Sequence, residues 1–376
     1  MKNICSHHVG ARSGNRAFPV LEKFEDDITN VLYDADESCL KQIERINLGL
    51  NSEITILPYY VGSTDLEKAT FNLNYDPYTS SALDKNPDYD GWYFYFRNGG
   101  YDNIIKDTIK TIEKKEVPLR SLDSILHENQ TLPKPDILSL DTQGSEYDIL
   151  TGAVDTLKEN VLAVITEVEF HEIYAGQKLY GDISRFLKEY DFDFVQFTKP
   201  IHEYSPYRNS IGLRGRGFQV CTDALYFKKI DKIASINDTI IRQTMLDKLA
   251  FIAIIYDQFE YALECLETSR QQGRINTNIE DNRYNYLLLL KDIENELLHL
   301  KGVFPPDFPK VYTYEQSKAR FTEESTFQLT DRITPLDTGE IENFKDSNIE
   351  LVLRNYGLHS QANVLKNIRI QQSHFI

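Results

Sequence analysis

Three short segments carry residue types that could hold a nucleotide-like ligand at one edge of a sheet. One is the turn from Gly10 to Gly14, one ends in Asp34, and one ends in Asp141. Glycine lets a backbone approach a ligand closely, and a helix that starts there offers free N–H groups. A carboxylate after the second strand of such a fold accepts hydrogen bonds from a ribose diol. Together the segments predict a cradle for a nucleotide or an adenosyl ligand.

Two of these segments have a second interpretation. The glycine spacing is G-x-x-x-G and not the G-x-G-x-x-G of dinucleotide-binding proteins, so Gly10–Gly14 taken alone also matches an ordinary surface turn. Asp36 follows Asp34 closely, and it could lie near an adenine or cap a helix predicted at Glu37–Leu48.

The third segment, Asp136–Gly152, has the pattern of a strand followed by a helix. An apolar run at Ile137–Leu140 ends in Asp141, and Gly144 and Glu146 precede a helical pattern. Strand, glycine turn and helix make one βα unit of a parallel sheet. Because ligands of such sheets bind beyond the carboxyl ends of the strands, we expect Asp141 at the binding edge.

Apolar runs and helical periodicity indicate the elements that must position these residues. Strands are predicted at Ile4–Val9, Asn30–Asp36, Ile54–Val61, Ile137–Leu140, Leu162–Val168, Phe192–Phe197 and Ala224–Lys228. Helices are predicted at Phe18–Phe24, at Glu37–Leu48, from Leu122 and at Ile183–Tyr190, and two short strands at Ile109–Ile112 and Val117–Leu119. Strands that alternate with helices are typical of an α/β fold.

Two loops carry residues suited to an acceptor. Residues 62–101 are rich in Tyr, Asn, Asp, Ser and Gly and contain the aromatic run Trp92–Phe96. A loop this long is uncommon unless it has a function, so it is either a lid that stacks on a sugar or a hairpin at the sheet edge. A later loop contains Arg208, Arg214 and Arg216, which could hold a phosphate of a sugar-nucleotide or glycolipid, or could simply be solvated.

Beyond about residue 232 the pattern becomes helical. Helical periodicity covers Asp238–Arg270 and Asn282–Leu300, which predicts an αα-hairpin, and short helices are expected at Ile349–Leu353 and Val364–Ile370. We therefore divide the chain into a domain at 1–230 and a mainly α-helical region at 231–376. The second region is assigned to homo-oligomerisation or to presentation of the acceptor.

The composition narrows the class of protein and its partners. The chain has 376 residues, of which 41% are hydrophobic and 26% charged, as in soluble globular proteins of two domains. Its apolar runs are too short to span a membrane, and its start lacks a signal-peptide pattern. Four scattered cysteines fit a reducing compartment, so the protein is expected in the cytoplasm. A net charge of −17 disfavours nucleic acid and anionic lipid as partners.

With these residues in place, the chain resembles the FkbM-type methyltransferases. The matching segments, in order, are VGARSGN, LYDAD, FNLNYDPYTSSALDKN, VPLRSLDSIL, PDILSLDTQGSEYDILTGA, ITEVEFHEIYAGQKLYGDI and DALYF. They cover about residues 1–230. The resemblance implies a class I methyltransferase Rossmann-like fold, with a mostly parallel seven-stranded sheet and helices on both faces. It also implies S-adenosyl-L-methionine as cofactor.

The resemblance also implies roles for the residues at the binding edge. The implied cofactor-binding residues are Gly10, Ala11, Arg12, Gly14, Asp34, Ala35 and Asp141. The glycine turn would back the methionine and ribose of the cofactor, and Asp34 would bind the ribose hydroxyls. The chain departs from the family where His7-His8 stands in place of a common acid and where LSLD lacks a Lys that often precedes the acid.

Methyl transfer to a hydroxyl also needs a base, because the hydroxyl loses its proton during attack. Asp141 is expected near the sulfonium or the acceptor, and Glu167 and His171 are the candidate bases, with Glu146 as a third. A lone His after a strand is more often a structural hydrogen-bonding group, and Glu146 could simply favour the start of its helix. Asp141, Glu167 and His171 could instead hold Mg²⁺, although their spacing does not demand a metal.

Three functions are compatible with these features. The leading hypothesis is an S-adenosylmethionine-dependent O-methyltransferase that acts on a sugar hydroxyl of a surface glycan or its precursor, with a carbohydrate or glycolipid as acceptor. The second is a nicotinamide-dependent enzyme, which the glycine spacing disfavours. The third is a non-catalytic interaction protein that uses its helical C-terminal region.

Overall fold

The computed structural model describes residues 3–13, 18–35, 40–46, 52–95, 102–207, 217–273, 283–297 and 348–373. Gly14, Asp36, Arg208, Arg214 and Arg216, whose roles were predicted above, lie outside the described residues. By its contacts the chain divides into one unit of residues 1–254 and 258–286 and a second of residues 255–257 and 287–376.

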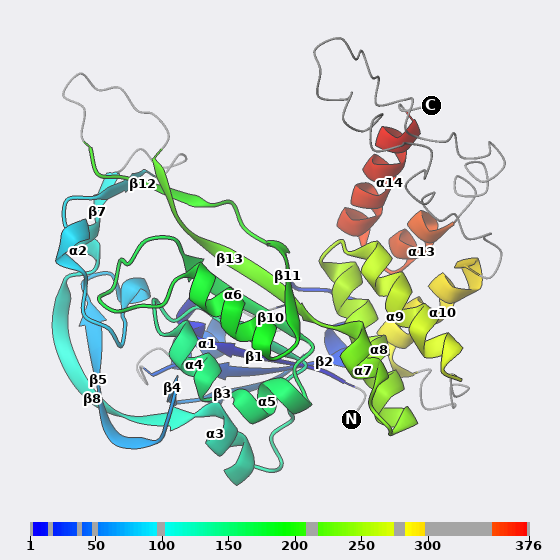
Figure 1. Ribbon diagram of the computed structural model, residues 1–376, viewed down its shortest axis with the longest axis horizontal. Coiled ribbons are helices and arrows are strands. Elements are labelled where there is room, and N and C mark those ends of the chain that lie inside the picture. The colour runs from blue at the N-terminus through cyan, green and yellow to red at the C-terminus, as the bar shows by residue number, and fades with distance from the viewer. Residues whose placement is uncertain are drawn as a thin grey trace, which may run out of the picture. The chain divides into compact units, whose positions relative to one another are not determined.

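A twisted sheet organises the first unit (Figure 1). Its main strands, in spatial order, are β3 (Glu53–Leu57), β2 (Ile28–Tyr33), β1 (Ile4–Val9), β9 (Ile137–Leu140), β10 (Ala163–Glu169), β13 (Phe218–Lys228) and β11 (Phe192–Phe197). The first five are parallel, and β13 runs antiparallel to both β10 and β11. These seven strands confirm the predicted Rossmann-like methyltransferase sheet.

Helices cover both faces of this sheet because the strands alternate their buried side chains. On one face a core cluster joins β2 residues Val31 and Tyr33 to residues of four helices, which Figure 1 shows lying over the sheet. The helices are α3 (Leu122–Glu128), α4 (Glu146–Thr151), α5 (Val154–Glu159) and α6 (Tyr180–Glu189). On the other face Leu32 packs against Ile43 of α1 (Leu40–Ile46).

Further strands extend this core beside the binding edge. The sheet continues from β13 through β12 (His202–Ser205), β6 (Tyr93–Tyr95) and β7 (Asp102–Ile104), followed by α2 (Ile105–Thr108). A separate three-stranded sheet contains β4 (Tyr60–Gly62), β8 (Thr111–Ser121) and β5 (Leu66–Asn74). Short 3₁₀ helices at Pro77–Thr79 (η4) and Pro87–Tyr89 (η5) follow β5. The predicted loop at 62–101 is therefore ordered over residues 62–95 as strands and short helices.

Three predicted elements were wrong in detail. The strand predicted at Ile54–Val61 is two strands in different sheets, because Pro58 interrupts it and cannot donate to a ladder. The short strands predicted at Ile109–Ile112 and Val117–Leu119 are mostly one long strand, β8. The helix predicted at Phe18–Phe24 is a turn leading to a 3₁₀ helix at Glu25–Asp27, and the Glu25 carboxylate accepts a hydrogen bond from Leu21 N at 2.9 Å.

The C-terminal part is helical, as predicted, but the single helix predicted at Asp238–Arg270 as half of an αα-hairpin is two helices. The first unit continues with α7 (Ile230–Ala234), α8 (Thr239–Ile255) and α9 (Phe259–Gln271), and Asp257 separates the last two with a left-handed φ of 63°. The second unit contains most of α10 (Asn285–Leu297), with α13 (Ile349–Asn355) and α14 (His359–Ser373). No helix among the described residues is long and apolar enough to span a membrane.

Candidate active site

A pocket of about 310 Å³ opens at the carboxyl ends of β1, β2, β9 and β10. It is lined by Val9, Gly10, Arg12, Tyr33, Asp34, Ala35, Tyr59, Tyr60, Val61, Phe71, Pro77, Tyr78, Ser80, Asp141, Thr142, Gln143, Ser145, Glu167, Lys199 and His202. The predicted residues Gly10, Arg12, Asp34, Ala35, Asp141 and Glu167 are thus brought together. Their convergence follows from parallel strands, whose carboxyl ends share one edge.

Gly10 lets two strand ends meet beneath this pocket. Its φ is +92°, and a Cβ built on it would lie 1.8 Å from the carbonyl oxygen of Asp141. The backbone ladder continues on both sides, because Gly10 N donates to Tyr33 O and Asp141 N donates to Val9 O, each at 3.0 Å. Gly10, at the end of the central strand β1, therefore lies between the strand end that leads to Asp34 and the one that carries Asp141.

The turn after β9 is fixed by the buried Glu146. Its carboxylate accepts hydrogen bonds from Thr142 N at 2.7 Å, Thr142 Oγ1 at 3.0 Å and Gly144 N at 3.0 Å. Burial raises the pKa of Glu146 to about 7, although its hydrogen bonds act in the opposite direction. Glu146 does not line the pocket, so its position is that of a group that shapes the turn.

Gln143 joins the two carboxylates at the back of the pocket. Its Nε2 donates to Glu167 Oε2 at 2.7 Å and to Asp141 Oδ1 at 3.2 Å, and its Oε1 accepts from the Tyr174 hydroxyl at 3.2 Å. Gln143 has a left-handed φ of 58°, which a non-glycine residue adopts rarely and which is common at functional sites. One amide therefore sets the spacing of Asp141 and Glu167.

The pocket lining holds three carboxyl groups, those of Asp34, Asp141 and Glu167, and two cationic side chains, those of Arg12 and Lys199. Burial and then the charge of Asp141 raise the pKa of Glu167 well above its usual value. The cation of Lys199 is itself paired, because its Nζ lies 2.7 Å from Asp223 Oδ2. The exposed His202 stands on the rim, on β12. The geometry suits a ligand that carries positive charge and an acceptor that must give up a proton.

Beneath the pocket, the two histidines of β1 are buried and neutral. The Pro133 carbonyl accepts from His7 Nε2 at 2.9 Å, so Nδ1 of the neutral ring accepts from the Tyr33 hydroxyl at 2.9 Å. His8 Nδ1 lies 2.8 Å from Ser139 Oγ, while its Nε2 has no partner among the described residues. Burial lowers the pKa of His7 to about 3 and that of His8 to about 4.

A comparison with known protein families identifies the family of residues 8–194. The family model described as the methyltransferase FkbM domain matches residues 8–194, which contain the glycine turn, Asp34, Asp141 and Glu167. Residues 8–194 are an FkbM methyltransferase domain. The match confirms the predicted family and supports methyl transfer as the reaction class.

A search of curated proteins gives no match. Among solved structures, a methyltransferase FkbM from Methylobacillus flagellatus KT is similar to the chain at 13% sequence identity, with a TM-score of 0.29. That similarity covers 59% of this chain and 43% of the other, so the chain spans less than half the length of that protein.

Besides Glu146, two predicted residues of the FkbM domain do not line its pocket. Ala11 is fully buried and packs with Leu32 and Ile43, so it supports the turn from behind. His171 contacts the rings of Tyr89 and Trp92 instead. The described residues contain no group of three or more His, Cys, Asp or Glu side chains placed to hold a metal ion, so the Mg²⁺ hypothesis gains no support.

Sequence reasoning missed several residues that line the pocket of the FkbM domain. They are Tyr59, Tyr60, Phe71, Tyr78, Thr142, Gln143, Ser145, Lys199 and His202. Gln143 and Ser145 lie within the segment that was singled out, so their position beside Asp141 was a usable signal. Lys199 and His202 follow β11, and nothing local in the sequence connects them with the sheet edge.

Proposed function

We propose that this chain is an S-adenosylmethionine-dependent O-methyltransferase that acts on a sugar hydroxyl of a surface glycan or its precursor. The observation that carries the proposal is the convergence of Asp34, Asp141 and Glu167 on one pocket at the carboxyl edge of the sheet. Such an edge is where α/β sheets bind their ligands.

The residues of the pocket suit this cofactor. Bound S-adenosylmethionine supplies an electrophilic methyl group on a positively charged sulfur. Asp34, buried at the end of β2, is placed to accept hydrogen bonds from the ribose diol. Asp141 gives the pocket a carboxylate that favours a sulfonium over a neutral thioether, and Glu167 adds to this charge when it ionises.

Glu167 is the residue best placed to take the acceptor proton. It lines the pocket, and Gln143 Nε2 holds one of its oxygens at 2.7 Å. A raised pKa makes its carboxylate a stronger base, and a positive charge in the pocket would help it to ionise. His202 on the rim is a second candidate, reached from the solvent side.

A sugar acceptor is supported by the aromatic residues of the pocket lining. The lining includes Tyr59, Tyr60, Phe71 and Tyr78 together with Ser80. Aromatic rings combine a large apolar face with, in tyrosine, a polar tip. This mixture is suited to the alternating C–H faces and hydroxyls of a sugar ring.

The test is calorimetric titration of the full chain with S-adenosylmethionine, followed by methyl-transfer assays. We expect Asp34→Ala to weaken cofactor binding by roughly 10- to 100-fold, since hydrogen bonds to a charged group are lost. Glu167→Gln should leave cofactor affinity nearly unchanged and lower kcat by about 100-fold or more. The exposed Asp155→Ala serves as the matched control. Absence of cofactor binding by the wild-type chain, or binding of NAD in its place, would refute the proposal.

A further inference from the structure

Four aromatic rings gather outside the pocket, just beyond the end of β10. The cluster consists of Tyr89, Trp92, His171 and Phe218, with Trp92 at its centre. The centroid of the Trp92 ring lies 4.8 Å from the ring centroid of Tyr89, 5.1 Å from that of His171 and 5.6 Å from that of Phe218. The rings of His171 and Phe218 are nearly parallel, with an interplanar angle of 17° and centroids 6.2 Å apart.

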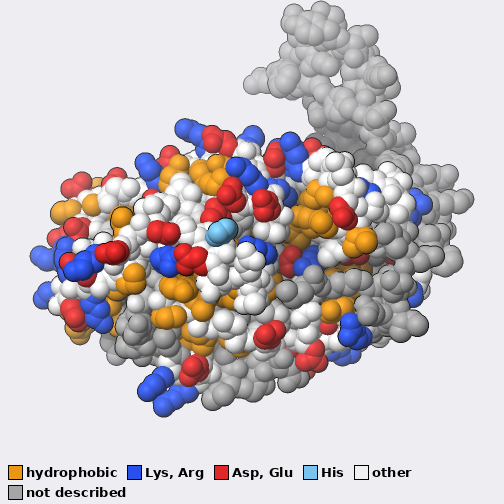
Figure 2. Space-filling model, turned by 90° about the horizontal axis from the view of Figure 1, so that it is seen from below, with side chains coloured by type: hydrophobic (Ala, Val, Ile, Leu, Met, Phe, Trp, Pro, Cys, Tyr) orange, Lys and Arg blue, Asp and Glu red, His pale blue; other side chains and the backbone are white. Residues whose placement is uncertain are grey.

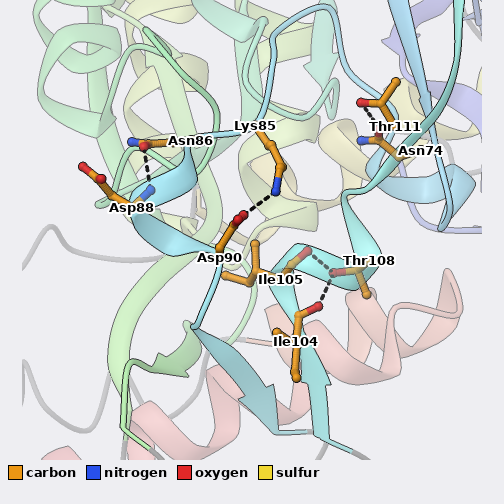
Figure 3. A network of polar contacts seen from close by, with 9 residues as sticks. All are labelled: Asn74, Lys85, Asn86, Asp88, Asp90, Ile104, Ile105, Thr108 and Thr111. Carbon is orange, nitrogen blue, oxygen red and sulfur yellow. Dashed lines mark hydrogen bonds and ion pairs between the residues drawn. The ribbon is translucent and has the colours of Figure 1, made fainter.

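The aromatic cluster is held in place before any ligand arrives. Trp92 N donates to Tyr89 O, and Ile105 N donates to Trp92 O, each at 2.9 Å. Asn86 caps η5 by accepting from Asp88 N at 3.1 Å, and Lys85 pairs with Asp90 (Figure 3). Asn86 also ties this segment to the chain after β10, because its Nδ2 donates to Glu172 O at 2.7 Å. A fixed set of rings binds without a large loss of side-chain entropy.

Part of the aromatic cluster faces solvent. Phe218 is 49% exposed, while Tyr89, Trp92 and His171 are half-buried. Beneath them lies a small apolar core that contains Ile105, Ile173 and Val220. Core packing does not explain why the ring of Phe218, at the start of β13, is this exposed. The half-buried Asp90 and the exposed Asp88 lie on the same short segment and supply hydrogen-bond acceptors (Figure 3).

One strand connects the aromatic cluster to the pocket. His202 lines the pocket, and two residues further along β12 Tyr204 pairs with Phe218. Two residues of a strand span roughly 7 Å. A cavity of about 90 Å³, lined by Tyr204 and Val220, also shares Gln143 and Glu167 with the pocket. The aromatic cluster is therefore close enough to hold the neighbour of a residue bound in the pocket.

We propose that the aromatic cluster is a second acceptor subsite, which binds a sugar ring adjacent to the one that is methylated. The inference rests on the proposed function, and it implies an oligosaccharide and not a free monosaccharide as acceptor. The C–H face of a pyranose stacks on Phe218 and Trp92, and its hydroxyls reach Asp88 and His171. A protein partner is a poorer fit, because one exposed ring is far less than the area of a stable protein interface.

Trp92 is the single tryptophan of the chain and so reports on this subsite directly. The experiment titrates the full chain with cellobiose, mannobiose and the corresponding monosaccharides, and screens it on an array of bacterial surface glycans. We expect Trp92 fluorescence to change with oligosaccharides and array binding to be detectable. Phe218→Ala should weaken that binding roughly 3- to 10-fold. Phe194→Ala, which removes a ring that is 40% exposed in another aromatic cluster, should not.

The outcomes separate this inference from the proposed function. Glycan binding that depends on Phe218 in a chain that does not bind S-adenosylmethionine would leave the subsite standing and remove the methyltransferase proposal. Cofactor binding without any Trp92 response or array signal would overturn the subsite. Glycan binding that is the same in wild type and Phe218→Ala would also overturn it, as would a change of oligomeric state in Phe218→Ala measured by light scattering, which would assign the ring to a protein contact.

Discussion

At the residue scale, the site depends on which polar groups are charged. Asp141 and Glu167 share the amide of Gln143, which keeps their two carboxyl groups at a fixed spacing. The histidines of β1 lie under the same strand ends but stay neutral, because burial disfavours the imidazolium. The carboxyl groups of the pocket favour a cationic ligand at the edge of the sheet, whereas the neutral histidines of β1 add no positive charge there.

The neutral histidines predict a loss of stability in acid. The pKa is near 6.5 in an unfolded chain and about 3 for His7 and about 4 for His8 in the folded chain. A lowered pKa adds stability that is present above pH 6.5 and is lost as pH falls toward the folded value. Between pH 6.5 and pH 5, each buried histidine should lower the free energy of unfolding by about 2 kcal/mol.

The measurement is the free energy of unfolding of His8→Asn and of wild type at pH 7 and pH 5. Asn does not titrate, so we expect the variant to lose less stability on acidification than wild type. His359→Asn, at an exposed position, is the control and should follow the wild type. Equal pH dependence of His8→Asn and wild type would show that His8 is charged or solvated in the folded chain.

At the element scale, α8 is fastened to the start of the sheet by a buried ion pair. Lys248 Nζ lies 2.8 Å from Asp136 Oδ2 and 3.0 Å from Oδ1, and Asp136 Oδ2 also accepts from Cys5 N at 2.7 Å. Phe251 of the same helix stacks with Phe18 and packs on Phe24. This packing explains why the segment predicted as a helix at Phe18–Phe24 is a turn, since its two rings reach α8 from opposite ends of the segment.

The ion pair predicts a large effect of removing one partner. Lys248→Ala leaves the Asp136 carboxylate buried without its cation, which should cost about 3–5 kcal/mol. Lys232→Ala removes a lysine that is 47% exposed and lies 3.2 Å from Asp191, and should cost less than 1 kcal/mol. Urea unfolding of the full chain measures both. If Lys248→Ala lowered the free energy of unfolding no more than Lys232→Ala, the ion pair of Lys248 and Asp136 would be solvated. Helix α8 would then be held by its apolar face.

At the scale of the whole molecule, the methyltransferase fold extends past the matched domain. The family model ends at residue 194, yet β11 and β13 complete the sheet up to Lys228. By their contacts, α7, α8 and α9 group with the sheet, whereas the boundary predicted at residue 230 stays a prediction. On the face seen in Figure 2, acidic and basic side chains are interspersed, so the negative charge of the chain is not gathered there into one patch.

The extended fold predicts different outcomes for two truncations. A chain of residues 1–234 loses Lys248 and the buried apolar residues of α8, so we expect it to aggregate or to melt well below the full chain. A chain of residues 1–297 keeps α8, α9 and Tyr286, whose backbone N donates to Asp27 at 2.9 Å, and should keep cooperative melting and cofactor binding. Circular dichroism and calorimetry compare them. A stable, cofactor-binding 1–234 chain would make α8 an accessory element.

The sequence by itself determined the sheet and the residues at its edge. Ile4–Val9, Asn30–Asp34 and Ile137–Asp141 are strand segments that are followed by Gly10 or end in a carboxylate. Parallel strands bring such ends together at one edge of the sheet. The prediction of Asp34, Asp141 and Glu167 therefore needed only the order of strands. The acceptor and its sugar chemistry stay a proposal, since no local pattern encodes them.

Only the tertiary structure decided the positions that depend on long-range packing. His171 leaves the pocket because the chain after β10 is tied to Asn86, 86 residues away in sequence from Glu172. Lys199 and His202 enter the pocket because the chain returns to pair with β13, which runs antiparallel. The turn at Phe18–Phe24 depends on Phe251 of α8. In each case the contact that decides the position joins residues far apart in the chain. The hydrophobic periodicity of a segment does not predict such a contact.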